Sequence, residues 1–177
     1  MSGKNYNFKL VKDVFNTPWF SVEEIPSVPP RKEPYYSISC PDSVAILAKT
    51  LEGKYILVRQ FRPPQGQYTL ELPSGYVDRE ESNQEAVQRE FLEETGYRCE
   101  DIIYLGAFKI CPSRISNTVH VYCGFNARPE TNKHNDDNDI EIVLVSEKSF
   151  EKYISNGTYN ETVGIVAYFL SKGRVFS

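Results

Sequence analysis

The chain has 177 residues, of which 40% are hydrophobic and 25% are charged, so it is long enough for one domain with a sizeable core and a short additional unit. Its net charge of -4 provides no basic surface for a phosphate backbone, which argues against polymeric nucleic acid as a partner. No long apolar run indicates a leader or a membrane span, so we expect a cytoplasmic protein with no membrane partner. The four cysteines are scattered and form no CxxC pair, which disfavours a zinc site or a disulfide framework.

Two short strands are predicted between residues 6 and 25, on either side of the turn sequence NTP at 16–18. The segment PSVPPRKEP that follows cannot be regular throughout, because proline fixes its backbone angle and lacks an amide donor. We therefore predict a small N-terminal β subdomain over residues 1–33 and a larger domain over residues 34–177.

Strand-like runs dominate from Tyr35 onward, beginning with YYSISC, SVAILAKT, KYILVRQF and TLELP. The LEG sequence at 51–53 indicates a hairpin turn. Later elements follow in this order: strands at 102–110 and 118–125, a polar acidic loop at 132–139, a strand at 140–145, and helices near 147–155 and 161–172. This order predicts an α+β fold, layered as an α/β/α sandwich on a mixed and mostly antiparallel sheet.

The clearest helix signal lies between Ser82 and Thr95. Ser82 is followed three residues later by Glu85, which is the signature of a capping box, and Gly96 stands where a left-handed C-terminal cap is expected. Val87, Phe91 and Thr95 share a face that can pack on the sheet.

Three carboxylates, those of Glu90, Glu93 and Glu94, fall on another face of this helix. Like charges at this spacing destabilise a helix, so something positive should lie among them. Arg89 can bind one of these carboxylates, but a single guanidinium cannot neutralise all three. Hard oxygen ligands in this number suit Mg²⁺ or Mn²⁺.

A solvated acidic helix face is the alternative interpretation. Two features count against it. The acidic residues are not interleaved with lysines four positions later, and glycines bracket the segment at Gly75 and Gly96.

This segment resembles the nudix hydrolases. The residues that fall on the family spacing GX5EX7REUXEEXGU are Gly75, Glu81, Arg89, Glu90, Glu93, Glu94 and Gly96. Such a match arises by chance on the order of once in 10⁸ starting positions. Tyr97 departs from the pattern, which usually has an aliphatic residue there. The resemblance implies the nudix fold and the hydrolysis of a nucleoside diphosphate linked to another group X.

The resemblance also implies a metal site for this reaction, with Mg²⁺ as the expected ion and Mn²⁺ as the alternative. Glu90 and Glu94 would hold the principal metal, the backbone carbonyl of Ser74 would complete the site, and Glu93 would bind or orient a second ion. Glu81 and Arg89 would support the loop and the helix.

A more specific resemblance points to one branch of the family. The run RQFRPPQGQYTLELPSGYVD at 59–78 is similar to the ADP-sugar pyrophosphatases, and Pro112 lies sixteen residues after Gly96, as in ADP-ribose pyrophosphatases. The sequence CPSRISN at 111–117 departs from the usual loop pattern there. This branch implies cleavage of ADP-ribose into AMP and ribose 5-phosphate by a homodimer whose N-terminal subdomain serves dimerisation and base binding.

Arg62 is the candidate ligand of the pyrophosphate, because its planar fork can hold phosphate oxygens in two places. The alternative is a surface arginine paired with Glu71, and Glu71 could itself add a carboxylate to the site. Arg59 is a weaker candidate. Trp19 and Phe8 are the aromatic residues that the resemblance places against adenine, with a core or interface role as the alternative.

The resemblance to this branch implies that the general base lies in the acidic loop at 132–139. Asp139 is favoured because it adjoins a strand, with Asp137 as the rival and Asp136 nearby. If the loop cannot close, Glu93 or a metal-bound hydroxide alone would have to serve instead. His120 and His134 could titrate in the right range. However, the first is expected to be a sheet residue and the second a solvated loop residue.

Two functional rivals remain at this point. One keeps the chemistry and changes the substrate to GDP-mannose, UDP-glucose or a dinucleotide. The other is a nudix-fold module that binds a nucleotide without cleaving it. However, all the carboxylates of the family spacing are present, which argues for metal-dependent catalysis.

Overall fold

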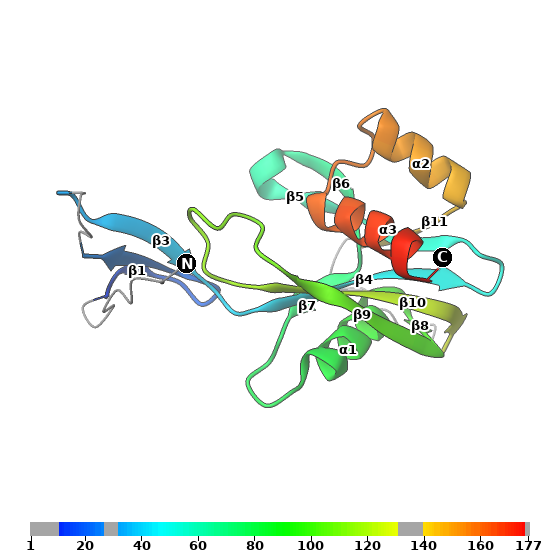
Figure 1. The fold of residues 1–177 in the computed structure, drawn as a ribbon, viewed down its shortest axis with the longest axis horizontal. Helices are drawn as coiled ribbons and strands as arrows, with labels where there is room; N and C mark the ends of the chain where they lie inside the picture. Colours follow the sequence, from blue (N-terminus) through cyan, green and yellow to red (C-terminus); the bar gives the residue numbers. More distant parts are fainter. Residues whose placement is uncertain (1–10, 27–31, 131–139, 176–177) are drawn as a thin grey trace.

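A computed structural model describes residues 11–26, 32–130 and 140–175 (Figure 1). A small sheet of three antiparallel strands comes first, in the order β1 (Lys12–Asn16), β2 (Ser21–Ile25) and β3 (Tyr35–Ser39). The turn between β1 and β2 is fixed by Thr17, whose Oγ1 accepts hydrogen bonds from the amides of Trp19 and Phe20 at 3.2 and 2.9 Å.

The pairing of β3 differs from the expected division of the chain. This strand falls in the range assigned to the larger domain, yet its residues Tyr35 to Ser39 pair in full register with Ile25 to Ser21 of β2. The small sheet therefore extends to Ser39.

The larger sheet contains eight strands. They are β4 (Ser43–Thr50), β5 (Tyr55–Arg62), β6 (Gln67–Glu71), β7 (Ser74–Tyr76), β8 (Tyr97–Arg98), β9 (Asp101–Phe108), β10 (Val119–Pro129) and β11 (Glu141–Val145). The central order is β11-β5-β4-β10-β8, with β6 beside β5, β7 beside β4 and β9 beside β10. Only the β4 and β10 pair is parallel among these pairings, which confirms the mixed, mostly antiparallel sheet.

Helices cover both faces of this sheet (Figure 1). Helix α1 (Asn83–Thr95) lies on one face, and α2 (Glu147–Ser155) and α3 (Thr162–Val175) lie on the other. Each face has its own core. Val87 and Phe91 of α1 pack with alternate residues of β4, whereas Phe150 and Tyr168 pack around Tyr55 on the opposite side. The predicted α/β/α layering is confirmed.

The helix predicted from the capping signature begins and ends as expected. Ser82 and Glu85 form the reciprocal capping box, and Gly96 closes α1 with a φ of 70°. Three short elements were not predicted: β7, β8 and the 3-10 helix η1 (Pro63–Gln65). Each is three residues or fewer, which is too short for a periodic pattern to develop. Within the described residues no helix is both long and apolar enough to cross a membrane.

Candidate active site

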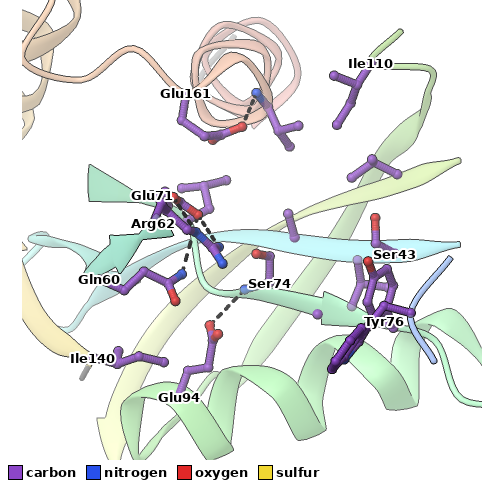
Figure 2. A pocket seen from close by; sticks show the side chains of 17 residues that line it. Ser43, Gln60, Arg62, Glu71, Ser74, Tyr76, Glu94, Ile110, Ile140 and Glu161 are labelled. Atoms are coloured by element: carbon purple, nitrogen blue, oxygen red, sulfur yellow. Dashed lines mark hydrogen bonds and ion pairs between the residues drawn. The ribbon is translucent and has the colours of Figure 1, made fainter. Parts of the chain in front are cut away.

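A cavity of about 640 Å³ lies between the small sheet, the middle of the large sheet and the first turn of α3. Figure 2 shows its walls: Glu94 stands on one side, Glu161 on the opposite side, and Arg62 and Glu71 lie between them. Charged groups of both signs therefore face a space that is large enough for a small polar ligand.

Glu94 reaches this cavity from the last turn of α1. Its carboxylate accepts a hydrogen bond of 2.9 Å from the amide of Ser74 on β7. Burial raises the pKa of Glu94 to about 7, and the negative charge of Glu90 adds to this effect, although the bond from Ser74 opposes it. A carboxylate with such a pKa is poised to gain from a nearby cation.

Glu90 approaches the same strand one turn earlier in the helix. A Cβ atom at Gly75 would stand 2.0 Å from the carboxyl carbon of Glu90, so only glycine leaves room for this side chain. Burial raises the pKa of Glu90 as well, while the hydrogen bond from Arg89 lowers it. The pairing of β7 with β4 holds Ser74 and Gly75 in place over the helix.

Arg89 connects the acidic groups around this helix. Its guanidinium donates to Glu81 at 2.6 and 3.1 Å, to Glu90 at 2.8 Å and to Glu93 at 3.2 Å. It also donates to the backbone carbonyl of Tyr76 at 3.1 Å, which ties β7 to α1. The predicted bracing role of this arginine matches its position, and Glu93 is turned toward Arg89 with 46% of its side chain exposed.

The site provides some of the oxygen ligands that a divalent cation needs. Within the described ranges, no three His, Cys, Asp or Glu side chains converge as a preformed metal cluster. Glu90 and Glu94 nevertheless present two desolvated carboxylates at the turn of Ser74 and Gly75. Hard oxygen donors of this kind are suited to Mg²⁺, which typically takes one or two protein carboxylates and fills its other positions with water or phosphate.

The raised pKa of Glu94 predicts an unusual pH dependence of stability. Between about pH 4.5 and about pH 7 the folded protein keeps a proton that the unfolded chain has released, so the free energy of unfolding falls as the pH rises through this window. We expect a loss of up to about 3 kcal/mol for the metal-free protein. Above about pH 7 the two states carry the same charge at this group and the slope ends.

Urea unfolding in EDTA at intervals from about pH 5 to about pH 8 measures this slope. Glu94→Gln should make the slope smaller, because the amide does not titrate and only Glu90, whose pKa burial also raises, then adds a slope of this sign. The carboxyls of Glu71 and Glu81 have lowered pKa values and change charge below this window. Identical slopes for the wild type and the variant would contradict the assignment.

Arg62 and Glu71 face each other across the β5–β6 hairpin. Nε and Nη2 of Arg62 donate to the two carboxylate oxygens of Glu71 at 2.9 and 2.6 Å. Although burial raises the pKa of Glu71, the bonds from Arg62 and Thr69 lower it overall, so the carboxyl stays ionised. The pairing considered as an alternative from the sequence is thus present, and the same Arg62 also lines the cavity.

Trp19 lines the cavity from the turn between β1 and β2, with 65% of the residue exposed. The small sheet that carries it is tied to the 109–118 loop. Ile38 donates to the carbonyl of Arg114 at 2.7 Å and accepts from Ser116 at 3.0 Å. Pro112 lies in this loop but does not line the cavity, whereas Ile110 does.

Several predicted residues lie elsewhere. Arg59 pairs with Glu141 at 2.9 Å and does not line the cavity. His120 is a residue of β10 whose Nδ1 lies 3.1 Å from the hydroxyl of Tyr104. The remaining candidates fall outside the described residues: Phe8, His134, Asp136, Asp137 and Asp139.

Sequence reasoning missed Glu161, Gln60 and Tyr76, which all line the cavity. Glu161 is the first residue of the helix predicted at 161–172, so an acidic capping role could have been read from its position. Its approach to Arg62 depends on how α3 packs on the sheet, which no local pattern reveals.

The fold and the cavity together define an α+β domain with a small-molecule pocket rich in carboxylates. The sequence profile of the NUDIX domain matches residues 41–160. The chain therefore belongs to the NUDIX domain family, as the spacing of the glutamates indicated.

Individual relatives agree with this assignment. The ADP-ribose pyrophosphatase of Bacillus subtilis is 36% identical over 108 residues, which cover 60% of this chain and 58% of that protein. The ADP-sugar pyrophosphatase of Mus musculus is 42% identical over 79 residues, covering 44% of this chain and 36% of that one. The matched regions thus span between a third and three fifths of these relatives.

A solved structure described as an ADP compounds hydrolase superposes with a TM-score of 0.82. The match covers 100% of both chains at 22% sequence identity. At this identity the likeness establishes the fold, which is the nudix fold predicted from the sequence.

Proposed function

We propose that this protein hydrolyses the diphosphate bond of a nucleoside diphosphate sugar, with ADP-ribose as the substrate and AMP and ribose 5-phosphate as products. One observation carries the proposal. Two desolvated glutamates of α1, Glu90 and Glu94, meet the turn of Ser74 and Gly75, and Glu94 lines the same cavity as Arg62. The similarity to pyrophosphatases of ADP-ribose and ADP-sugars supports the choice of substrate.

The proposal includes Mg²⁺ as cofactor, with Mn²⁺ as a substitute. Glu90, Glu94 and the backbone carbonyl of Ser74 would hold it, and Glu93 would serve a second ion after leaving Arg89. When bound, such an ion offsets the charge of the phosphates and activates water for attack on phosphorus. The base that accepts the proton of this water is assigned to the acidic loop, with Asp139 ahead of Asp137.

Arg62 would bind the diphosphate. Glu71 holds one edge of its guanidinium through two hydrogen bonds, which leaves the remaining N–H donors for phosphate oxygens. Because the pairing fixes the side chain beforehand, little rotamer entropy is lost when the substrate binds. Glu71 therefore acts as a positioning residue for Arg62.

Trp19 would stack on the adenine, because it is an exposed aromatic residue at the end of the cavity nearest the small sheet. Stacking on one base is worth about 1–3 kcal/mol. Trp19→Ala should therefore raise the KM for ADP-ribose by about tenfold while kcat changes little. Steady-state kinetics of AMP release measures this, and Trp19→Phe serves as the control that keeps an aromatic face. An unchanged KM in Trp19→Ala would refute the stacking role.

A homodimer completes the proposal. The outer strand of the small sheet exposes apolar side chains, among them Val14 at 50% and Phe15 at 58% exposure. Such a surface is suited to pairing with a second copy, which would bring the small sheets close to the partner's cavity.

The test is a panel of nucleoside diphosphate sugars and dinucleotides, incubated with the protein and Mg²⁺ and analysed for nucleoside monophosphate. The highest kcat/KM is expected for ADP-ribose. A preference for GDP-mannose, UDP-glucose or a dinucleotide would retain the chemistry and replace the substrate. Binding of nucleotides without any cleavage would favour a binding module over an enzyme.

A further inference from the structure

A second hollow of about 430 Å³ adjoins the main cavity, and we call it the outer pocket. It lies between the β5–β6 hairpin, which contributes Gln67, and the segment before α3, which contributes Asn160. Arg62, Glu71 and Glu161 line both spaces, so the outer pocket lies next to the main cavity, beside the proposed diphosphate site. A group attached to the far phosphate could extend into it.

Glu161 is held firmly at this junction. One carboxylate oxygen accepts the amide of Val163 at 2.6 Å, and the other accepts the amide of Gly164 at 2.7 Å and the hydroxyl of Tyr159 at 2.9 Å. Tyr159 is 1% exposed, and a Cβ at Gly164 would stand 1.8 Å from its hydroxyl oxygen. The glycine thus allows the tyrosine to lie under the carboxylate, and the carboxylate faces the cavity (Figure 2).

Among Arg62, Glu71 and Glu161, which line both pockets, negative charges outnumber positive ones. Arg62 is matched by Glu71 in a bidentate ion pair. The three described donors to Glu161 are neutral backbone amides and a phenol, and its carboxylate forms no ion pair with any residue in the described part of the chain. An additional anion placed here would therefore be repelled, whereas a hydroxyl group could donate a hydrogen bond to the free lone pairs of the carboxylate.

We propose that the outer pocket receives the group X of the substrate and that Glu161 is its specificity residue, which favours a neutral, hydroxyl-bearing X over an anionic one. This inference rests on the proposed function, because it assumes that the diphosphate lies at Arg62. The amide side chains of Gln67 and Asn160 provide further donors and acceptors for a polyhydroxylated group. Discrimination arises mainly from the repulsion, since an unfavourable charge contact weakens the binding of the competing substrate.

The test compares ADP-ribose with ATP, which share the AMP moiety and differ in whether a sugar or an anionic phosphate follows the diphosphate. The wild type should prefer ADP-ribose. Glu161→Gln should raise kcat/KM for ATP relative to ADP-ribose by about tenfold, chiefly through KM, because one unit of negative charge leaves the junction. Chelation of Mg²⁺ by ATP affects all variants equally, so the change in ratio isolates the residue.

Asn160→Lys offers a second route that leaves the cap of α3 intact. It adds a cation to the outer pocket and should shift the ratio toward ATP in the same direction. Glu147→Gln removes an equivalent carboxylate from the first turn of α2, where it pairs with Lys49 and Lys172 outside both pockets, and should leave the ratio unchanged. Equal ratios for the wild type, Glu161→Gln and Asn160→Lys would overturn the inference.

Calorimetric binding of both nucleotides in EDTA separates this inference from the proposed function. If the wild type releases no AMP from either nucleotide, the hydrolase proposal is refuted, and the ratio of dissociation constants then decides the role of Glu161. If AMP is released but neither ratio responds to the two substitutions, the hydrolase proposal stands and the assignment of Glu161 is wrong.

Discussion

Glu94→Gln is expected to lower kcat for ADP-ribose by roughly a thousandfold or more, equivalent to about 4 kcal/mol of barrier. The amide can still accept the hydrogen bond of the Ser74 amide, so the local fold is retained. It cannot supply the negative charge that a divalent ion requires. Since burial already disfavours the ionised carboxyl, the variant should be at least as stable as the wild type when no metal is present.

AMP release under saturating ADP-ribose and Mg²⁺ measures the loss, and thermal unfolding with and without Mg²⁺ shows whether the fold is retained. The stabilisation that Mg²⁺ confers on the wild type should disappear in the variant. Glu100→Gln is the matched control, because this glutamate is 61% exposed beside Arg128 and does not line the cavity. Undiminished turnover in Glu94→Gln would remove Glu94 from the proposed metal site.

Gly75→Ala should also lower activity strongly, by roughly a hundredfold, although no charged group is removed. The new Cβ would meet all three carboxylate atoms of Glu90 at 2.0 to 2.3 Å, so the side chain must move away. The displaced carboxylate would break the arrangement with Arg89 and no longer stand over β7. A loss of Mg²⁺ affinity is therefore expected together with the loss of kcat.

Gly173→Ala is the matched control for this substitution, since nothing lies within 4 Å of a Cβ built at that position. Alanine also favours the helix, so this variant should be active and slightly more stable. Titration of Mg²⁺ against AMP release compares the two. If Gly75→Ala kept the kcat and the metal dependence of the wild type, close packing of Glu90 against β7 would have no part in catalysis.

The sequence predicted α1 well because its signals are local. The capping box of Ser82 and Glu85 and the left-handed Gly96 are set by residues within one turn of each end. The spacing of Glu90 and Glu94 also predicted that both carboxylates would lie on one face of this helix. Residues 35–39 were assigned to the larger domain, whereas in the structure they form β3 of the small sheet. The pairing of a strand depends on a partner elsewhere in the chain, here β2, which no local pattern reveals.

The rest of the site could not be predicted in the same way, because it is assembled from separate segments. Arg62 ends β5, Glu71 ends β6 and Glu161 precedes α3, and only the packing of α3 on the sheet brings the third to the other two. Trp19 was singled out through the family resemblance, but its contact with the cavity depends on how the 109–118 loop anchors the small sheet.

The most direct test of the central claim is the identity of the products formed from ADP-ribose. With Mg²⁺ present, the protein should yield AMP and ribose 5-phosphate in equal amounts, and EDTA should abolish both, because in the proposed site Glu90 and Glu94 would hold the ion that activates water. Chromatography of the reaction with standards for each product measures this. Release of ADP and free ribose, or no product under any metal condition, would contradict the account.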